Sequence, residues 1–156
     1  MDRKTLILIT LALVASLASF AGATEHVVPA AEFNLDDYAG KVVVVDFWAS
    51  WCPPCLKAMP FLSDMQAKYG EQGLVTIAVT VDQDPKAPGK MIATLQDDII
   101  VVRDHEGLLA RQYKISSIPA AFVIDREGNT VSTHVGFQDS EKKGREAELV
   151  KLLAAE

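Results

Sequence analysis

The chain has 156 residues, 49% of them hydrophobic, which is enough for one buried core and leaves little chain for a second domain. Its 15 basic and 21 acidic side chains give a formal net charge of −6, with no basic cluster along the chain. Nucleic acid is therefore excluded as an expected partner, since phosphate contacts need clustered Lys and Arg.

The first 23 residues have the pattern of an export signal. A short charged start precedes an apolar run from Thr5 to Phe20, and Ala21-Gly22-Ala23 is typical of a cleavage site. The pattern predicts a signal peptide over residues 1–23 and one exported domain over residues 24–156. The run also approaches the roughly 20 residues that a membrane helix needs, so an uncleaved anchor is the alternative.

After this segment, strand and helix patterns alternate. Lys41–Phe47 is a β-branched run of the kind that is buried on both faces of a sheet. Residues 53–69 predict a helix that begins with proline and ends before glycine, and 74–81 predict a second strand. The two strands should be parallel, so their carboxyl ends, where such sheets place ligands, carry residues 48–55 and Asp82.

The second half of the chain has shorter patterns. They predict a helix at 89–95, a strand at 99–102, a helix at 108–113, a hairpin of 120–124 with 130–135, and a closing helix at 146–155. The whole pattern predicts an α/β domain.

The chain has only two cysteines, Cys52 and Cys55, separated by two prolines. A loop this short restricts the unfolded chain little, which argues against a structural disulfide and favours redox chemistry. A zinc site is the rival interpretation. Four ligands are usual for zinc, a second cysteine pair is missing, and only His105 and His134 could complete the site, so we expect no metal.

The segment Val45-Asp46-Phe47-Trp48-Ala49-Ser50-Trp51-Cys52-Pro53-Pro54-Cys55, followed by Pro60 and later by Ile118-Pro119, resembles the thioredoxin superfamily. It is most similar to the exported TlpA/ResA branch, over roughly Phe33 to the C-terminus. The resemblance implies a thioredoxin fold, a central mixed sheet flanked by helices, with the inserted segment of the TlpA-like branch before Ile118. It also implies that no cofactor is needed besides a redox-active disulfide between Cys52 and Cys55.

The chemistry of the pair follows from its expected place at a helix N-terminus, which stabilises a thiolate. We expect Cys52 to attack a substrate disulfide and Cys55, one turn later, to resolve the mixed disulfide. Pro53 and Pro54 have no N–H, so only the Cys55 N–H is expected to cap Cys52. This limited stabilisation favours a reductant over a strong oxidant.

The resemblance also implies roles for other residues. Asp46 matches the buried carboxylate assigned to proton transfer with the resolving cysteine, although an aspartate that caps a turn at a strand end is the alternative. Pro119 matches the cis-proline that faces the cysteines, and Ile118 would offer backbone groups to an extended substrate. Trp51 is expected to contact substrates, with simple packing as its alternative.

Pro53 and Pro54 are expected to border the same substrate surface. Three positions depart from the family. Ala58 stands where ResA-like proteins generally carry Glu, Ala120-Ala121 replaces a common Thr, and Ala78 stands where thioredoxin has the Lys that accompanies its carboxylate.

The expected function is a protein-disulfide reductase acting on exported proteins, for example apocytochrome c, in the bacterial periplasm or at the outer face of the cytoplasmic membrane. The resemblance implies a membrane thiol carrier of the CcdA/DsbD type as electron donor, and we expect a monomer. The alternatives are a thiol peroxidase of the peroxiredoxin type and a non-enzymatic module that binds copper or a partner protein.

Overall fold

The computed structural model describes residues 27–95 and 98–155, so the predicted signal peptide lies outside the described residues. Within them the chain forms one six-stranded sheet in the order β1-β4-β3-β2-β5-β6. The strands are β1 (Val27–Pro29), β2 (Val42–Trp48), β3 (Leu74–Thr80), β4 (Ile100–Arg103), β5 (Ala120–Ile124) and β6 (Thr130–Val135).

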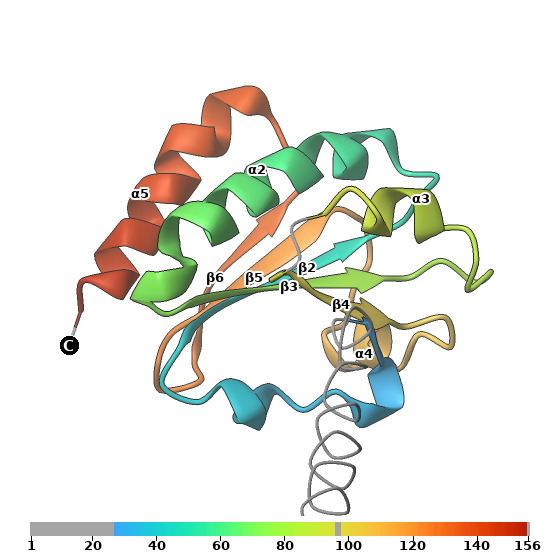
Figure 1. The fold of residues 1–156 in the computed structure, drawn as a ribbon, viewed down its shortest axis with the longest axis horizontal. Helices are drawn as coiled ribbons and strands as arrows, with labels where there is room; N and C mark the ends of the chain where they lie inside the picture. The colour runs from blue at the N-terminus through green and yellow to red at the C-terminus, as the bar shows by residue number, and fades with distance from the viewer. Residues whose placement is uncertain (1–26, 96–97, 156) are drawn as a thin grey trace, which may run out of the picture.

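The helices cover both faces of this sheet (Figure 1). Helices α2 and α5 cross one face, and α4 packs on the other face with the turns that follow β1 (Figure 1). The α-helices are α2 (Pro53–Tyr69), α3 (Gly89–Ile92), α4 (Leu108–Gln112) and α5 (Lys142–Leu153), and the 3-10 turns are η2 (Ala30–Glu32), η3 (Leu35–Tyr38), η4 (Gly70–Gln72) and η5 (Asp139–Glu141).

Strand β2 lies inside the sheet and is buried along its whole length, as its β-branched sequence predicted. It pairs with β3 in parallel and with β5 in antiparallel orientation, which makes the sheet mixed. Its side chains alternate between the two faces: Val44 and Trp48 pack towards α2 and α5, whereas Val45 and Phe47 pack towards α4. The predicted mixed sheet flanked by helices is therefore confirmed.

Three elements differ from the sequence-based expectation, and the first of them, helix α3, ends at Ile92 and not at residue 95. Strand β1 was not predicted, because its three residues are too few to show alternation, and it forms by pairing in parallel with β4. Helix α5 begins at Lys142, not at residue 146. Its first turn has no apolar periodicity and is held by polar contacts instead. The Glu141 carboxylate accepts hydrogen bonds from Gln138 N–H at 3.0 Å and from Arg145 at 2.9 Å.

In the part of the chain that the structure describes, no helix combines the length and the apolar character needed to span a membrane.

Candidate active site

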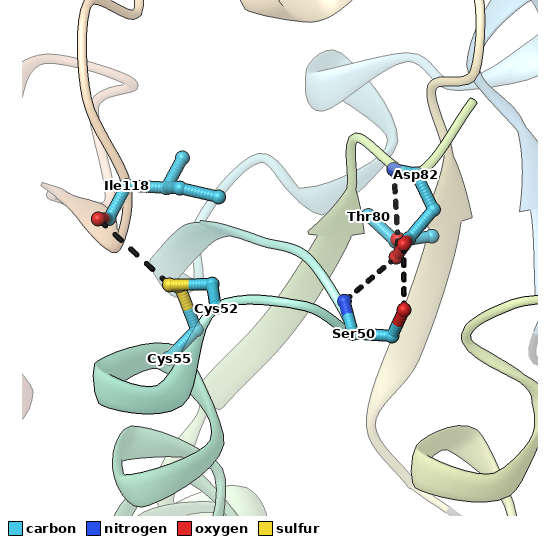
Figure 2. Close-up of a disulfide and its surroundings, with 6 residues drawn as sticks. All are labelled: Ser50, Cys52, Cys55, Thr80, Asp82 and Ile118. Carbon is cyan, nitrogen blue, oxygen red and sulfur yellow. Dashed lines mark hydrogen bonds between the residues drawn. A yellow bond between two sulfur atoms is a disulfide. The ribbon is translucent and has the colours of Figure 1, made fainter.

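The two cysteines form a disulfide at the N-terminus of α2 (Figure 2). Strand β2 ends at Trp48, and a tight turn follows in which the Cys52 N–H donates to the Ala49 carbonyl at 3.1 Å. Cys52 immediately precedes the helix and is 5% exposed, whereas Cys55 in the first turn is 0% exposed. The strand, the turn and the helix therefore bring one sulfur close to the surface and seal the other inside.

The expected cap on Cys52 concerns the thiolate, whereas its sulfur here belongs to the disulfide. Among the described residues, no hydrogen bond caps the Cys52 side chain in this oxidised form. Its backbone carbonyl accepts the Leu56 N–H at 3.1 Å, which closes the first turn of α2. Capping of the reduced Cys52 stays a prediction.

The Ile118-Pro119 loop lies directly beside the disulfide. The peptide bond between Ile118 and Pro119 is cis, which confirms what the resemblance implied. The Cys52 Sγ lies 3.9 Å from the Ile118 carbonyl oxygen (Figure 2). The structure thus brings together two segments that lie 66 residues apart, and it places a backbone acceptor next to the outer sulfur.

The two tryptophans near the site have opposite environments. Trp48 is 0% exposed within the core, whereas Trp51 is 67% exposed. Pro53 and Pro54 are exposed too, so the neighbours of the outer cysteine in sequence, Trp51, Pro53 and Pro54, form an exposed apolar rim next to it. A side chain so exposed buries little surface, which disfavours the packing alternative for Trp51, and its contact with substrates stays a prediction.

Asp46 lies inside β2 with only 2% of its surface exposed. Its side chain is on the same face as Val44 and Trp48, whose core layer also contains Cys55. The Oδ2 atom has no hydrogen-bond partner among the described residues, so it caps no turn there. Burial raises the pKa of Asp46 to about 8, and the positive charge of Arg145 opposes that rise. The group can therefore exchange a proton near neutral pH.

The sequence did not indicate the side chain of Arg145 near the site or the contact that Asp82 makes there. Arg145 of α5 reaches the layer of Asp46 and is fixed by donating to the Gly136 carbonyl at 2.8 Å, but no motif marked it. Asp82 was expected at this edge of the sheet, yet nothing in the sequence indicated that it binds Ser50 at 2.9 Å (Figure 2).

The two histidines that the structure describes, His105 and His134, do not join the cysteines. His134 contacts Glu148 at 2.8 Å, and His105 is exposed. Within residues 27–95 and 98–155, no group of three or more His, Cys, Asp or Glu side chains could hold a metal ion.

The sequence profile of the Redoxin family matches residues 19–153. The chain belongs to that family. Its relatives include the thiol-disulfide oxidoreductase ResA of Bacillus thuringiensis subsp. konkukian, which is 31% identical over 111 residues. That match covers 71% of this chain and 64% of the ResA protein, so it spans just under two thirds of the relative's length. ResA of Geobacillus kaustophilus is 29% identical over 120 residues, with 77% and 69% covered.

Solved structures agree with this Redoxin assignment. A protein of Chlorobium tepidum, assigned as a thiol:disulfide interchange protein DsbE, is 37% identical with a TM-score of 0.73 and 77% and 85% of the two chains covered. The exposed lipoprotein thioredoxin of Streptococcus pneumoniae is 29% identical with a TM-score of 0.65 and 77% and 91% covered. The chain is therefore a TlpA/ResA-like member of the thioredoxin superfamily, with the thioredoxin fold.

Proposed function

We propose that this protein is an exported thiol–disulfide oxidoreductase that reduces disulfides of other exported proteins through Cys52 and Cys55. The observation that carries the proposal is the asymmetry of the pair. Cys52 lies at a helix N-terminus beside the Ile118 carbonyl, whereas Cys55 is sealed behind it. A reactive dithiol needs one sulfur that a substrate can reach and one that only the first sulfur can reach. Relatives named as thiol-disulfide oxidoreductases support the same chemistry.

The first step is attack by the Cys52 thiolate on one sulfur of a substrate disulfide. A bond forms between Cys52 and that sulfur, the substrate S–S bond breaks, and the other substrate sulfur leaves as a thiolate that takes up a proton. The N-terminus of α2 stabilises the attacking anion. The exposed rim of Trp51, Pro53 and Pro54 and the edge at Ile118 would hold the substrate segment.

The second step resolves the mixed disulfide. Cys55 loses its proton to the ionised form of Asp46 and attacks the Cys52 sulfur, and the remaining substrate sulfur leaves and is protonated. The Cys52–Cys55 disulfide forms, and the substrate has gained two electrons and two protons. Asp46 suits this proton transfer because burial raises its pKa to about 8, close to the working range of a base at neutral pH.

The proposed direction of electron flow follows from the weak stabilisation of the Cys52 thiolate. Pro53 and Pro54 contribute no N–H to a thiolate at this helix end. A less stabilised thiolate makes the dithiol a stronger reductant. Apocytochrome c is the proposed example of a substrate, and a membrane thiol carrier of the CcdA/DsbD type is the proposed electron donor. Both come from the family resemblance, as does the location in the periplasm or at the outer face of the cytoplasmic membrane.

The reduction potential of the purified full chain tests the direction. We expect a value near that of thioredoxin, about −270 mV, when the protein is equilibrated with a dithiol of known potential. A value as oxidising as that of DsbA, about −120 mV, would contradict the reductase proposal. Peroxide turnover measured on the same preparation should be absent. Efficient turnover would favour the thiol peroxidase alternative.

A trapping experiment tests the substrate class. Cys55→Ser should accumulate mixed disulfides between Cys52 and exported proteins, because the resolving thiol is missing. The control is the double variant Cys52→Ser with Cys55→Ser, which should trap nothing. Failure to trap any exported protein would count against a dedicated reductase, and absence of apocytochrome c from the trapped set would remove that example.

A further inference from the structure

A second buried carboxylate, Asp82, lies just beyond the end of β3 and is 3% exposed. Its Oδ2 accepts hydrogen bonds from Ser50 N–H at 2.9 Å and from the Thr80 hydroxyl at 2.7 Å. Its Oδ1 accepts the Ser50 hydroxyl at 2.7 Å (Figure 2). Two of these three bonds therefore go to one residue on the loop that leads to the disulfide.

Ser50 is the second residue of the turn Ala49–Cys52, which is closed by the Cys52 N–H and the Ala49 carbonyl. The strand end before the turn is fixed as well, since the Val81 N–H donates to the Trp48 carbonyl at 2.9 Å. Trp51, the third residue of the turn, is 67% exposed and cannot anchor it. Asp82 is thus the side chain that holds the turn whose last residue is Cys52.

Asp82 also carries a charge that no cation offsets. Its three donors are neutral, and among the ion pairs of residues 27–95 and 98–155 none includes Asp82. The other titratable groups on elements around the disulfide are Asp46 of β2, which is buried and keeps its proton at neutral pH because its pKa is raised to about 8, and the exposed Lys57, Asp84 and Lys114. Exposed charges are screened by solvent, so the charge of Asp82 acts more strongly than theirs.

We propose that Asp82 is a positioning residue for the attacking thiol: its carboxylate clamps the Ala49–Cys52 turn through Ser50, which lies two residues before Cys52, and it places an uncompensated negative charge beside that turn. A nearby like charge disfavours the thiolate, which makes the dithiol more reducing. The inference rests on the dithiol chemistry of the proposed function and adds a residue that sets its geometry and its driving force.

The variant Asp82→Asn removes the negative charge but keeps the hydrogen bonds of the clamp, so it tests the charge by itself. The amide oxygen can accept from Ser50 N–H and Thr80, and the amide nitrogen can donate to the Ser50 hydroxyl, so the turn keeps its bonds. In the reduced full chain, the pH midpoint of Cys52 alkylation by iodoacetamide should move down by about one pH unit. The equilibrium with glutathione should shift roughly threefold or more towards the dithiol form.

The matched control for charge is Asp84→Asn. It removes the same charge from the same loop at an exposed position, where among the described residues the Asp84 carboxylate accepts only the Lys86 N–H. The pH midpoint of Cys52 alkylation and the equilibrium with glutathione should both stay at wild-type values in this control. An unchanged alkylation midpoint in Asp82→Asn, or an equal shift in Asp84→Asn, would overturn the charge effect.

Asp82→Ala tests the clamp, because it removes all three bonds. At a pH where Cys52 is fully ionised, its rate of exchange with the small disulfide DTNB should fall about tenfold, since the turn loses its fixed geometry. Asp82→Asn should retain most of that exchange rate. In Ser50→Ala, which keeps the carboxylate of Asp82, the rate should fall about threefold.

If Asp82→Ala does not fold, the pair Ser50→Ala and Asp82→Asn decides the point. An unchanged limiting rate in Ser50→Ala, and in Asp82→Ala where it folds, would overturn the positioning role. A wild-type potential as oxidising as that of DsbA would contradict the reductase proposal alone, because this inference rests on differences between variants.

Discussion

The two buried carboxyl groups of β2 and of the segment after β3 have opposite surroundings. Asp46 lies within β2, Asp82 lies just beyond the end of the neighbouring parallel strand β3, and they are 2% and 3% exposed. The Oδ2 of Asp46 has no partner among the described residues. Asp82, in contrast, accepts three hydrogen bonds from Ser50 and Thr80.

The difference shows that burial alone does not decide what a carboxyl group does. Without hydrogen-bond donors, desolvation penalises the charged form, so Asp46 holds its proton up to a pKa of about 8. With three donors, the buried carboxylate of Asp82 is satisfied and can act as an anchor. The sealed Cys55 shares the core layer of Val44 and Trp48, and the more accessible Cys52 ends the turn held by Asp82.

The largest expected effect separates the two sulfurs. Cys52→Ser should abolish insulin-disulfide reduction, on the order of a thousandfold or more, because the attacking thiolate is gone. Cys55→Ser should also stop turnover but still perform the first attack and form a stable mixed disulfide. Stopped-flow release of thiolate from DTNB distinguishes the two variants. A burst in Cys52→Ser, with none in Cys55→Ser, would reverse the assigned roles.

The second comparison uses the two tryptophans. Trp48→Ala should lower the free energy of unfolding by about 3–5 kcal/mol, because it empties a fully buried site in the core. Trp51→Ala should change it by less than about 0.5 kcal/mol, because the side chain is 67% exposed. Urea denaturation of the oxidised proteins measures both. The exposed variant should instead reduce protein disulfides more slowly while its reaction with DTNB is unchanged.

Asp46→Asn tests the unpaired carboxyl. In the unfolded chain Asp46 ionises near its ordinary pKa of about 3.9, whereas in the fold it stays protonated up to about 8. At low pH Asp46 is protonated in both states and does not reduce the free energy of unfolding. As pH rises between these two values, the free energy of unfolding falls by a few kcal/mol. Asp46→Asn should remove this decline. Urea denaturation of the oxidised chain at pH 5 and pH 8 checks it, and equal declines in variant and wild type would contradict it.

The smallest effects come from the same substitution at two buried threonines of β3. Thr80→Val removes the hydroxyl that donates to Asp82 at 2.7 Å, and it should cost about 1–3 kcal/mol of stability. The Thr76 hydroxyl oxygen has no partner among the described residues, so Thr76→Val should cost less than about 0.5 kcal/mol. Thermal or urea denaturation measures the difference. Equal losses of stability in the two variants would contradict the contrast between the partnered and the unpartnered hydroxyl group.

Local patterns were sufficient for much of the fold. The β-branched run of β2, the proline at the start of α2 and the glycine after it, and the hairpin of β5 and β6 lie close to where their sequences predicted. Strand β1 could not be predicted, because only its pairing with β4 makes those three residues a strand. The start of α5 was placed too late because its first turn depends on polar contacts of Glu141.

The features of the candidate site likewise divide into those that the sequence predicted and those that only the fold decided. The sequence by itself determined the two cysteines, the prolines between them, the helix that they open and the proline loop that faces them, because these features are local or carried by a specific motif. Tertiary structure decided which sulfur is sealed, which tryptophan is exposed, that Arg145 lies near Asp46, and that Asp82 binds Ser50. Burial and hydrogen-bond partners depend on segments far apart in the chain, so only packing determines whether a buried carboxyl group keeps its proton or anchors a turn.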